Sequence, residues 1–178
     1  MRIQKVGIVG AGTMGSSIAE LLAYNGIPVL LTDVDRPTVE RGLDRVRGLV
    51  RGLIEFHAQR ADREIRRISD LGVPLTDSQI AGLRQRLAPK FDDARGNEIA
   101  GRVEGVTDLE GFDGVDLVIE AVFERIEVKR PLLERLDRIV PDHAVLASNT
   151  SALSITRLAR GLRHAGQTLG VHFFNPPS

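Results

Sequence analysis

The stretch GIVGAGTMGSSIAE, which runs from Gly7 to Glu20, decides the fold. Three glycines in it follow the pattern G-x-G-x-x-G, and they are Gly10, Gly12 and Gly15. The first glycine permits a tight turn, the second lets the backbone approach a pyrophosphate, and the third lets a helix pack closely on a strand. The spacing alone is a weak signal, so the flanking sequence must decide between a phosphate loop and a plain turn into a helix.

The sequence on either side of the glycines predicts a strand and then a helix. Residues 3–9 are rich in Val and Ile, and residues 13–25 place apolar side chains on one face of a helix that Gly26 ends. The start of this helix offers free N–H groups, here at Thr13 and Met14, and a partial positive charge. The glycine turn is therefore predicted to bind the pyrophosphate of a dinucleotide.

A carboxylate follows the second predicted strand, residues 28–32. Asp33 can accept hydrogen bonds from both hydroxyls of an adenosine ribose, and it would repel a 2′-phosphate. NAD is therefore favoured over NADP as the cofactor, although Arg36 is near enough in sequence to keep NADP open. The simpler alternative is that Asp33 only caps the helix that follows.

The composition is that of an ordinary globular protein. The 178 residues include 42% hydrophobic and 27% charged residues, enough for one domain with a sizeable core. Lys+Arg and Asp+Glu are both 24, so the overall charge indicates neither nucleic acid nor a membrane as a partner. Cysteine is absent, which excludes disulfides and thiolate metal ligands, and no metal site is expected. We expect a soluble cytoplasmic protein without a signal peptide or membrane span.

The rest of the chain alternates predicted helices and strands, as a doubly wound α/β fold does. Residues 37–68 are helical in pattern and rich in arginine, and a further helix is expected over 78–87. Other expected elements are strands over 102–107, 115–119, 144–147 and 168–172 and helices over 131–139 and 154–160. The sequence thus predicts one Rossmann-type domain over residues 1–178, with a mostly parallel sheet and a helical excursion at about 37–101.

Three later stretches are predicted to follow strand ends at the crevice of this sheet. They are VIEAVFERIEVK (118–129), ASNTSALSIT (147–156) and GVHFFNPPS (170–178). Together with the glycine loop they resemble the L-3-hydroxyacyl-CoA dehydrogenase family, which includes 3-hydroxybutyryl-CoA dehydrogenases. The resemblance covers most of the chain except the helical stretch from about 37 to 102.

The resemblance implies an oxidoreductase that uses NAD to oxidise a 3-hydroxyacyl-CoA to the 3-oxoacyl-CoA. It makes His172, in the H-F-F-N-P motif, the catalytic base. It places Ser151, in the S-N-T-S motif, near the substrate hydroxyl, and Asn149 of the same motif against the cofactor and the reacting groups.

The resemblance also assigns further residues to the cofactor. Glu124 and Lys129 are expected to line the NAD site, and Asn175 to lie near the nicotinamide. A homodimer is implied for the full-length protein, with a small acyl-CoA as its substrate.

Elementary chemistry supports the same roles but leaves alternatives. Removing a hydride from an alcohol also requires a proton acceptor, and histidine, with an unperturbed pKa of about 6.5, is suited to that role. His172 could instead be an edge histidine, Ser151 a helix cap and Asn149 a turn residue. Lys129 could pair with Glu124 or Glu127 on a helix surface. The other histidines are expected to be solvated, and they are His57, His143 and His164.

Two features implied by the family are missing from this sequence. The sequence ends six residues after His172, before the glutamate that pairs with the family's histidine, and it lacks the family's all-helical C-terminal domain. We expect a cofactor-binding domain of a longer dehydrogenase, which alone binds NAD but turns over poorly. A natural single-domain protein with a partner chain is the alternative.

The motifs do not single out one substrate. Related enzymes act on free hydroxy acids or on hydroxyacyl groups tethered to a carrier protein. The arginine-rich helices, from Arg41 to Arg86, could bind a CoA phosphate or an acidic carrier protein. A non-catalytic NAD-binding module is a further hypothesis.

Overall fold

The computed structural model describes residues 2–89 and 91–174. Its centre is one six-stranded sheet with the order β3-β2-β1-β4-β5-β6, in which every strand pair is parallel. The strands are β1 (Val6–Val9), β2 (Val29–Thr32), β3 (Val103–Gly105), β4 (Leu117–Glu120), β5 (Val145–Asn149) and β6 (Thr168–Val171). The predicted Rossmann-type fold is confirmed, and the sheet is wholly rather than mostly parallel.

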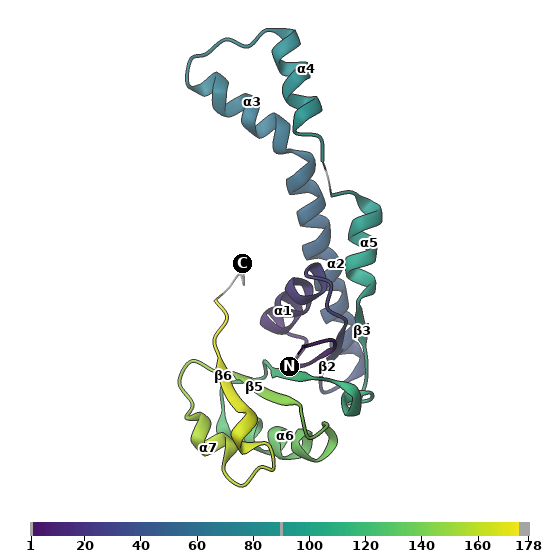
Figure 1. Ribbon diagram of the computed structural model, residues 1–178, viewed down its shortest axis with the longest axis vertical. Helices are drawn as coiled ribbons and strands as arrows, with labels where there is room; N and C mark the ends of the chain where they lie inside the picture. Colours follow the sequence, from purple (N-terminus) through teal and green to yellow (C-terminus); the bar gives the residue numbers. More distant parts are fainter. Residues whose placement is uncertain (1, 90, 175–178) are drawn as a thin grey trace.

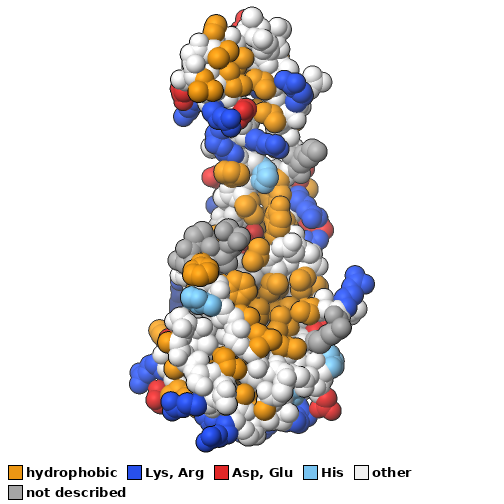
Figure 2. Space-filling view, turned by 60° about the vertical axis from the view of Figure 1, so that its left-hand side comes forward, with side chains coloured by type: hydrophobic (Ala, Val, Ile, Leu, Met, Phe, Trp, Pro, Cys, Tyr) orange, Lys and Arg blue, Asp and Glu red, His pale blue; other side chains and the backbone are white. Residues whose placement is uncertain are grey.

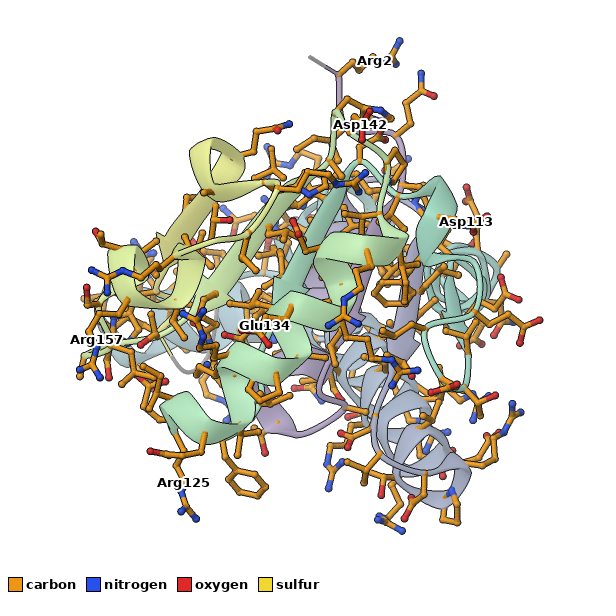
Figure 3. The ribbon with its side chains drawn as sticks, turned by 90° about the horizontal axis from the view of Figure 1, so that it is seen from below. Arg2, Asp113, Arg125, Glu134, Asp142 and Arg157 are labelled. Atoms are coloured by element: carbon orange, nitrogen blue, oxygen red, sulfur yellow. The ribbon has the colours of Figure 1, made fainter. Side chains whose placement is uncertain are left out.

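Helices cover both faces of the sheet. One face carries α1 (Thr13–Tyr24), α2 (Arg36–Ala58) and α5 (Asp93–Gly101), which contact one another. The other face carries the short turn η1 (Phe112–Gly114), α6 (Ile126–Ile139) and α7 (Ile155–Ala159). Seen from below, α6, on which Glu134 is labelled, crosses the sheet on this second face (Figure 3). A short turn, η2 (Ala165–Gln167), precedes β6.

Successive residues of β1 point into two separate cores. Ile8 is buried with Ile18 of α1 on one face, whereas Val9 is buried with Phe112 and Leu133 on the other. This alternation is the two-residue period of a strand that is buried on both sides. Because all four residues of β1 are buried, this short apolar run suits a central strand, which is covered on both faces.

The helical excursion forms an arm that extends away from the sheet (Figure 1). α2 packs its first turns on α1 and then continues outward, and α3 (Arg60–Asp70) and α4 (Asp77–Arg86) form a hairpin at the tip. Thr76 begins α4 with a capping box, in which its hydroxyl accepts from the Gln79 N–H while the Gln79 side chain accepts from the Thr76 N–H. Apolar side chains continue along the arm and gather where it joins the body (Figure 2).

The structure corrects several expected boundaries. α5 lies inside the excursion and was not predicted, because its glycines and short length hide the helical pattern; the Asp92 side chain caps it by accepting from the Arg95 N–H at 2.9 Å. α6 begins at Ile126 rather than at Pro131, which lies inside the helix. Pro131 is exposed, so water can reach the carbonyl that its ring leaves without a donor. No helix among the described residues is long and apolar enough to cross a membrane.

His164 is buried, which corrects the expectation that it is solvated. Its side chain is 1% exposed, with Nδ1 at 2.7 Å from Asp137 Oδ1 and Nε2 at 2.9 Å from the Pro141 carbonyl oxygen. Asp137 also accepts from the backbone N–H groups of Arg163 and His164, both at 2.9 Å. The pair joins the end of α6 to the turn before β6. By contrast, the His143 side chain is 59% exposed, as expected.

The Asp137–His164 pair makes the fold sensitive to acid. Burial raises the pKa of Asp137, but hydrogen bonds from the Arg163 and His164 backbone and from the His164 ring outweigh burial and hold the pKa below its usual value. Because the folded-state pKa lies below the unfolded value of about 3.9, this stabilisation is present at neutral pH. It is lost as the pH falls through the folded-state pKa.

We expect Asp137→Asn to lower the free energy of unfolding at pH 7 by about 1–3 kcal/mol, because buried donors lose an ionised acceptor. The difference from the unmodified chain should shrink as the pH falls through the folded-state pKa of Asp137, where Asp137 also loses its charge. Urea unfolding at a series of pH values measures both effects. Asp142→Asn is the control, since its side chain is 89% exposed. An equal loss at every pH would contradict the assignment.

Candidate functional site

The glycine loop lies at the point where the order of strands reverses, between β1 and β4. Such a switch point opens a crevice at the carboxyl ends of the strands. Gly10 has φ +108°, and a Cβ on it would lie 2.7 Å from the Ala121 carbonyl oxygen. A Cβ on Gly15 would overlap the Gly10 carbonyl oxygen. These two glycines are therefore required by the loop itself.

Gly12 has a different role from its neighbours. It is the N-cap of α1, makes no side-chain capping bond, and a Cβ on it would meet no atom within 4 Å. The space beside it is open, and the first turn of α1, with Thr13 and Met14, begins there. A pyrophosphate fits this arrangement, because the helix start offers N–H groups and a partial positive charge without an intervening side chain.

Asp33 is tied to the glycine loop. Its Oδ2 accepts from the Ala11 N–H at 2.6 Å, and its Oδ1 accepts from the Val34 N–H at 2.7 Å. The cap of α2 is Asp35, which accepts from the Thr38 N–H at 2.7 Å, so the alternative in which Asp33 caps this helix is wrong. Hydrogen bonds from Thr38 hold the pKa of Asp35 below its usual range.

Arg36, which had kept NADP open, is engaged elsewhere. Its guanidinium forms an ion pair with Glu40, one turn along α2, at 2.6 Å. This pair is exposed and weak, so the preference for a free 2′-hydroxyl rests on the carboxylate of Asp33.

A cavity of about 410 Å³ extends from Asp33 between the ends of β1, β2 and β4 and the helix α6. Its lining includes Val9, Thr32, Asp33, Val34, Asp35, Thr107, Asp108, Leu109, Val122, Val128, Leu132 and Arg135. Among the described residues, the Thr32 hydroxyl is a buried side-chain oxygen without a hydrogen-bond partner. An apolar cavity with an acceptor at Asp33 and an unsatisfied hydroxyl fits the adenosine half of a dinucleotide.

Lys129 and Glu120 form a buried ion pair beneath the second half of the crevice. Both side chains are 0% exposed, and Lys129 Nζ lies 2.9 Å from each oxygen of Glu120. Nζ also donates to the Asn149 carbonyl oxygen at 3.0 Å, and the Ser148 hydroxyl donates to Glu120. Burial raises the pKa of Glu120, and the bonds from Ser148 and Lys129 oppose that rise.

The interpretation of Lys129 as a surface residue on a helix flank is therefore wrong, whereas its pairing with Glu124 is confirmed, with Nζ 3.4 Å from Glu124 Oε2. A charge pattern in sequence does not show burial, and Lys129 follows the exposed residues of a helix start. Leaving Glu120 without Lys129 would cost about 3–5 kcal/mol, because an uncompensated charge would stay buried. The contact of Lys129 with NAD stays a prediction.

Glu124 fixes the loop that follows β5. One of its oxygens, Oε1, accepts from the Thr150 hydroxyl and from the N–H groups of Ser151 and Ala152, the latter two at 3.0 and 3.3 Å. Burial raises the pKa of Glu124, but these bonds together with Lys129 hold it below its usual value. Its side chain is 38% exposed, so the carboxylate reaches the surface of the crevice.

Asn149, Ser151 and His172 lie on neighbouring segments. The Phe173 N–H donates to Asn149 Oδ1 at 3.2 Å, which leaves the Asn149 NH₂ group as a donor. Ser151 is exposed and is not the cap of α7, because Ser154 holds that position by accepting from the Arg157 N–H. The exposed His172 ring packs against Phe174, with ring centroids 5.1 Å apart. Asn175 lies outside the described residues.

Comparison with known proteins identifies the family of this chain. The sequence profile described as "3-hydroxyacyl-CoA dehydrogenase, NAD binding domain" matches residues 5–81 and 76–178. The chain belongs to this family. It is an NAD-binding domain, and NAD is its cofactor, in agreement with the sequence analysis.

Relatives of this NAD-binding domain are longer proteins. The 3-hydroxyadipyl-CoA dehydrogenase of Escherichia coli is 33% identical over 176 residues, which cover 99% of this chain and 30% of the relative. The structure of FadB2 from M. tuberculosis is 31% identical with a TM-score of 0.72, over 99% of this chain and 51% of that one. The structure of the (S)-3-hydroxybutyryl-CoA dehydrogenase PaaH1 from Ralstonia eutropha is 32% identical with a TM-score of 0.68, over the same shares. The chain thus spans about half of these relatives or less.

Substitution of two glycines separates cofactor binding from folding in this domain. We expect Gly12→Ala to leave the melting temperature unchanged, since its Cβ would enter open space, but to weaken NAD binding at least about 10-fold by filling the pyrophosphate approach. Gly15→Ala should also lower the melting temperature, because its Cβ overlaps the Gly10 carbonyl. Calorimetric titration with NAD and thermal unfolding measure the two effects. Full NAD affinity in Gly12→Ala would rule out this phosphate site.

Proposed function

We propose that this domain supplies the NAD site and the catalytic base of a dehydrogenase that oxidises the C3 hydroxyl of a 3-hydroxyacyl-CoA. The observation that carries the proposal is the hydrogen bond from the Phe173 N–H to Asn149 Oδ1. It joins the segment that carries His172 to the loop that carries Ser151. Three groups able to act on an alcohol are thereby held at one edge of a sheet that binds NAD.

The proposed reaction breaks two bonds of the substrate. The O–H bond loses its proton to a base, and the C3–H bond loses its hydride to the cofactor. One ring nitrogen of His172 takes the hydroxyl proton, for which an imidazole is suited near neutral pH. The Ser151 hydroxyl donates a hydrogen bond to the oxygen as it becomes a carbonyl, and the Asn149 NH₂ orients the reacting groups. NAD, when bound, accepts the hydride from C3.

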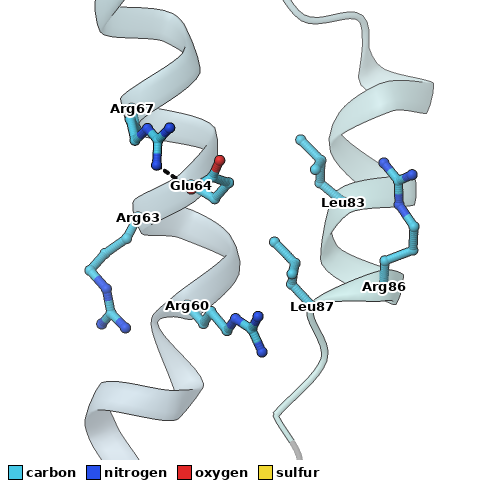
Figure 4. Close-up of a pocket in the computed structure, with 7 residues that line it drawn as sticks. All are labelled: Arg60, Arg63, Glu64, Arg67, Leu83, Arg86 and Leu87. Carbon is cyan, nitrogen blue, oxygen red and sulfur yellow. Dashed lines mark ion pairs between the residues drawn. The ribbon is translucent and has the colours of Figure 1, made fainter.

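The arm offers a place for the anionic end of the substrate. A cavity of about 570 Å³ between α3 and α4 is lined by Arg60, Arg63, Glu64, Arg67, Leu83, Arg86 and Leu87 (Figure 4). Arg63 stacks over Phe56 at 3.9 Å, and Arg67 pairs with Glu64 at 3.7 Å. Within the described part of the chain, Arg60 and Arg86 have no carboxylate partner.

These two arginines favour a phosphate-bearing thioester over a free hydroxy acid, because guanidinium groups bind phosphate strongly. The site would take the nucleotide phosphates of CoA. We also propose, on the family resemblance alone, that the whole protein is a cytoplasmic homodimer.

We expect His172→Gln, made in the whole protein that carries this domain, to lower kcat for a 3-hydroxyacyl-CoA by about 10²–10⁴-fold, since general base catalysis contributes that much. The Kd for NAD should change less than about 2-fold, because His172 lies beyond the phosphate and ribose sites. Steady-state kinetics and NAD titration provide the readout, with His143→Gln as the control. Unchanged turnover in His172→Gln would favour a non-catalytic NAD module.

A double substitution on the arm tests the substrate class. Arg60→Gln with Arg86→Gln should raise KM for the CoA thioester at least about 10-fold, because both charge-assisted contacts to phosphate are lost. KM for the matching pantetheine thioester, which lacks the nucleotide phosphates, should not change. Arg66→Gln is the matched control, because Arg66 lies on α3 but does not line the cavity. The same KM for CoA thioester in both proteins would remove the arm from the substrate site.

A further inference from the structure

The 410 Å³ cavity that fits the adenosine half of NAD is lined by polar side chains in two places. One is Asp33, and the other is the pair Asp108 and Arg135. Asp33, which is bonded to Ala11 of that loop, marks the ribose and pyrophosphate side. The base of the cofactor must therefore extend to the other part of the cavity, toward the segment after β3. That segment contributes Thr107, Asp108 and Leu109 to the lining.

The walls of this part are apolar. Val128 and Leu132 of α6 line one side, with Val122 from the end of β4, and Leu109 comes from the segment after β3. Aliphatic side chains on two sides suit the faces of a planar purine, but they do not distinguish one purine from another. Discrimination between bases requires a polar group at the ring's edge.

Asp108 and Arg135 supply such a group. They form an ion pair between Asp108 Oδ1 and the Arg135 guanidinium, which links the segment after β3 to α6 across the cavity. Their side chains are 80% and 51% exposed, so the pair contributes little to folding stability. Arg135 takes one oxygen of Asp108, which leaves the second oxygen free to accept from a ligand.

The backbone at this position is strained. Asp108 has φ 52° and Leu109 has φ 61°, in the left-handed region that residues with a side chain rarely adopt. The turn is held by the Glu110 N–H bonding to the Thr107 carbonyl at 3.0 Å and by the burial of Leu109. Strain that the surrounding structure maintains is often found where a side chain must be aimed at a ligand.

We propose that Asp108 recognises the 6-amino group of the adenine of NAD, with Arg135 as the positioning residue that holds its carboxylate. The inference rests on the NAD site described above. The amino group donates to the free oxygen of Asp108. A hypoxanthine presents a carbonyl oxygen at that position, which would face the carboxylate with two acceptors and no proton between them.

The test compares NAD with nicotinamide hypoxanthine dinucleotide, in which a carbonyl replaces the 6-amino group and the adjacent N1 carries a proton. We expect the unmodified chain to bind NAD at least about 10-fold more tightly than the hypoxanthine analogue in calorimetric titrations. Asp108→Asn should bring the two affinities within about 3-fold, because an amide can turn either its oxygen or its NH₂ toward the base. Asparagine also tolerates the left-handed backbone, so this variant should fold.

Two further variants sharpen the test. Arg135→Gln should reduce the ratio of the two affinities by a smaller factor, since Asp108 remains but is no longer held. Asp113→Asn is the matched control: Asp113 lies on η1 at the outer edge of the molecule (Figure 3) and does not line the cavity. The preference for NAD over NADP should be unchanged in Asp108→Asn, because that preference belongs to Asp33.

The outcomes separate this inference from the cofactor site itself. If the unmodified chain binds both dinucleotides equally, or if Asp108→Asn keeps the full preference, Asp108 does not read the base, although the NAD site stands. If the unmodified chain binds neither dinucleotide, the cofactor site is wrong and this inference fails with it.

Discussion

The ion pair between Lys129 and Glu120 is the interaction on which the crevice depends. It lies in the second half of the sheet, where β4 ends, β5 ends and α6 begins to cover both. Two charges removed from water are costly unless each is fully paired, and here Ser148, Glu124 and the Asn149 carbonyl supply the further partners. The pair therefore fixes how these three elements meet, and with them the loop that carries Asn149 and Ser151.

The two halves of the crevice present different chemical groups. In the first half, the glycine loop and the start of α1 present backbone N–H groups, and the Asp33 carboxylate joins this loop to β2. In the second half, side chains make the contacts. Glu124 accepts hydrogen bonds from N–H groups after β5, and Asn149 Oδ1 accepts from the Phe173 N–H after β6. We infer that the first half binds the phosphates of the cofactor.

Much of this arrangement could be predicted from the sequence, because local patterns determine it. The glycine spacing, the apolar strand before it and Asp33 after β2 are short-range signals, and the structure confirms the fold that they predict. Burial of charged groups could not be predicted. Lys129 and His164 look like surface residues in sequence, and only tertiary packing places Glu120 and Asp137 beside them. Asp108 carried no signal at all, since its backbone geometry depends on the turn around Leu109.

The proposed chemistry and the proposed recognition of adenine both depend on the direction in which NAD lies across the sheet. Intermolecular nuclear Overhauser effects between bound NAD and the chain measure this directly. We predict contacts from the adenine protons to Val128 and Leu132, and from the nicotinamide protons to the loop at 149–151 and the His172 ring. Contacts from the nicotinamide to the α6 side, or adenine contacts beside His172, would contradict this prediction.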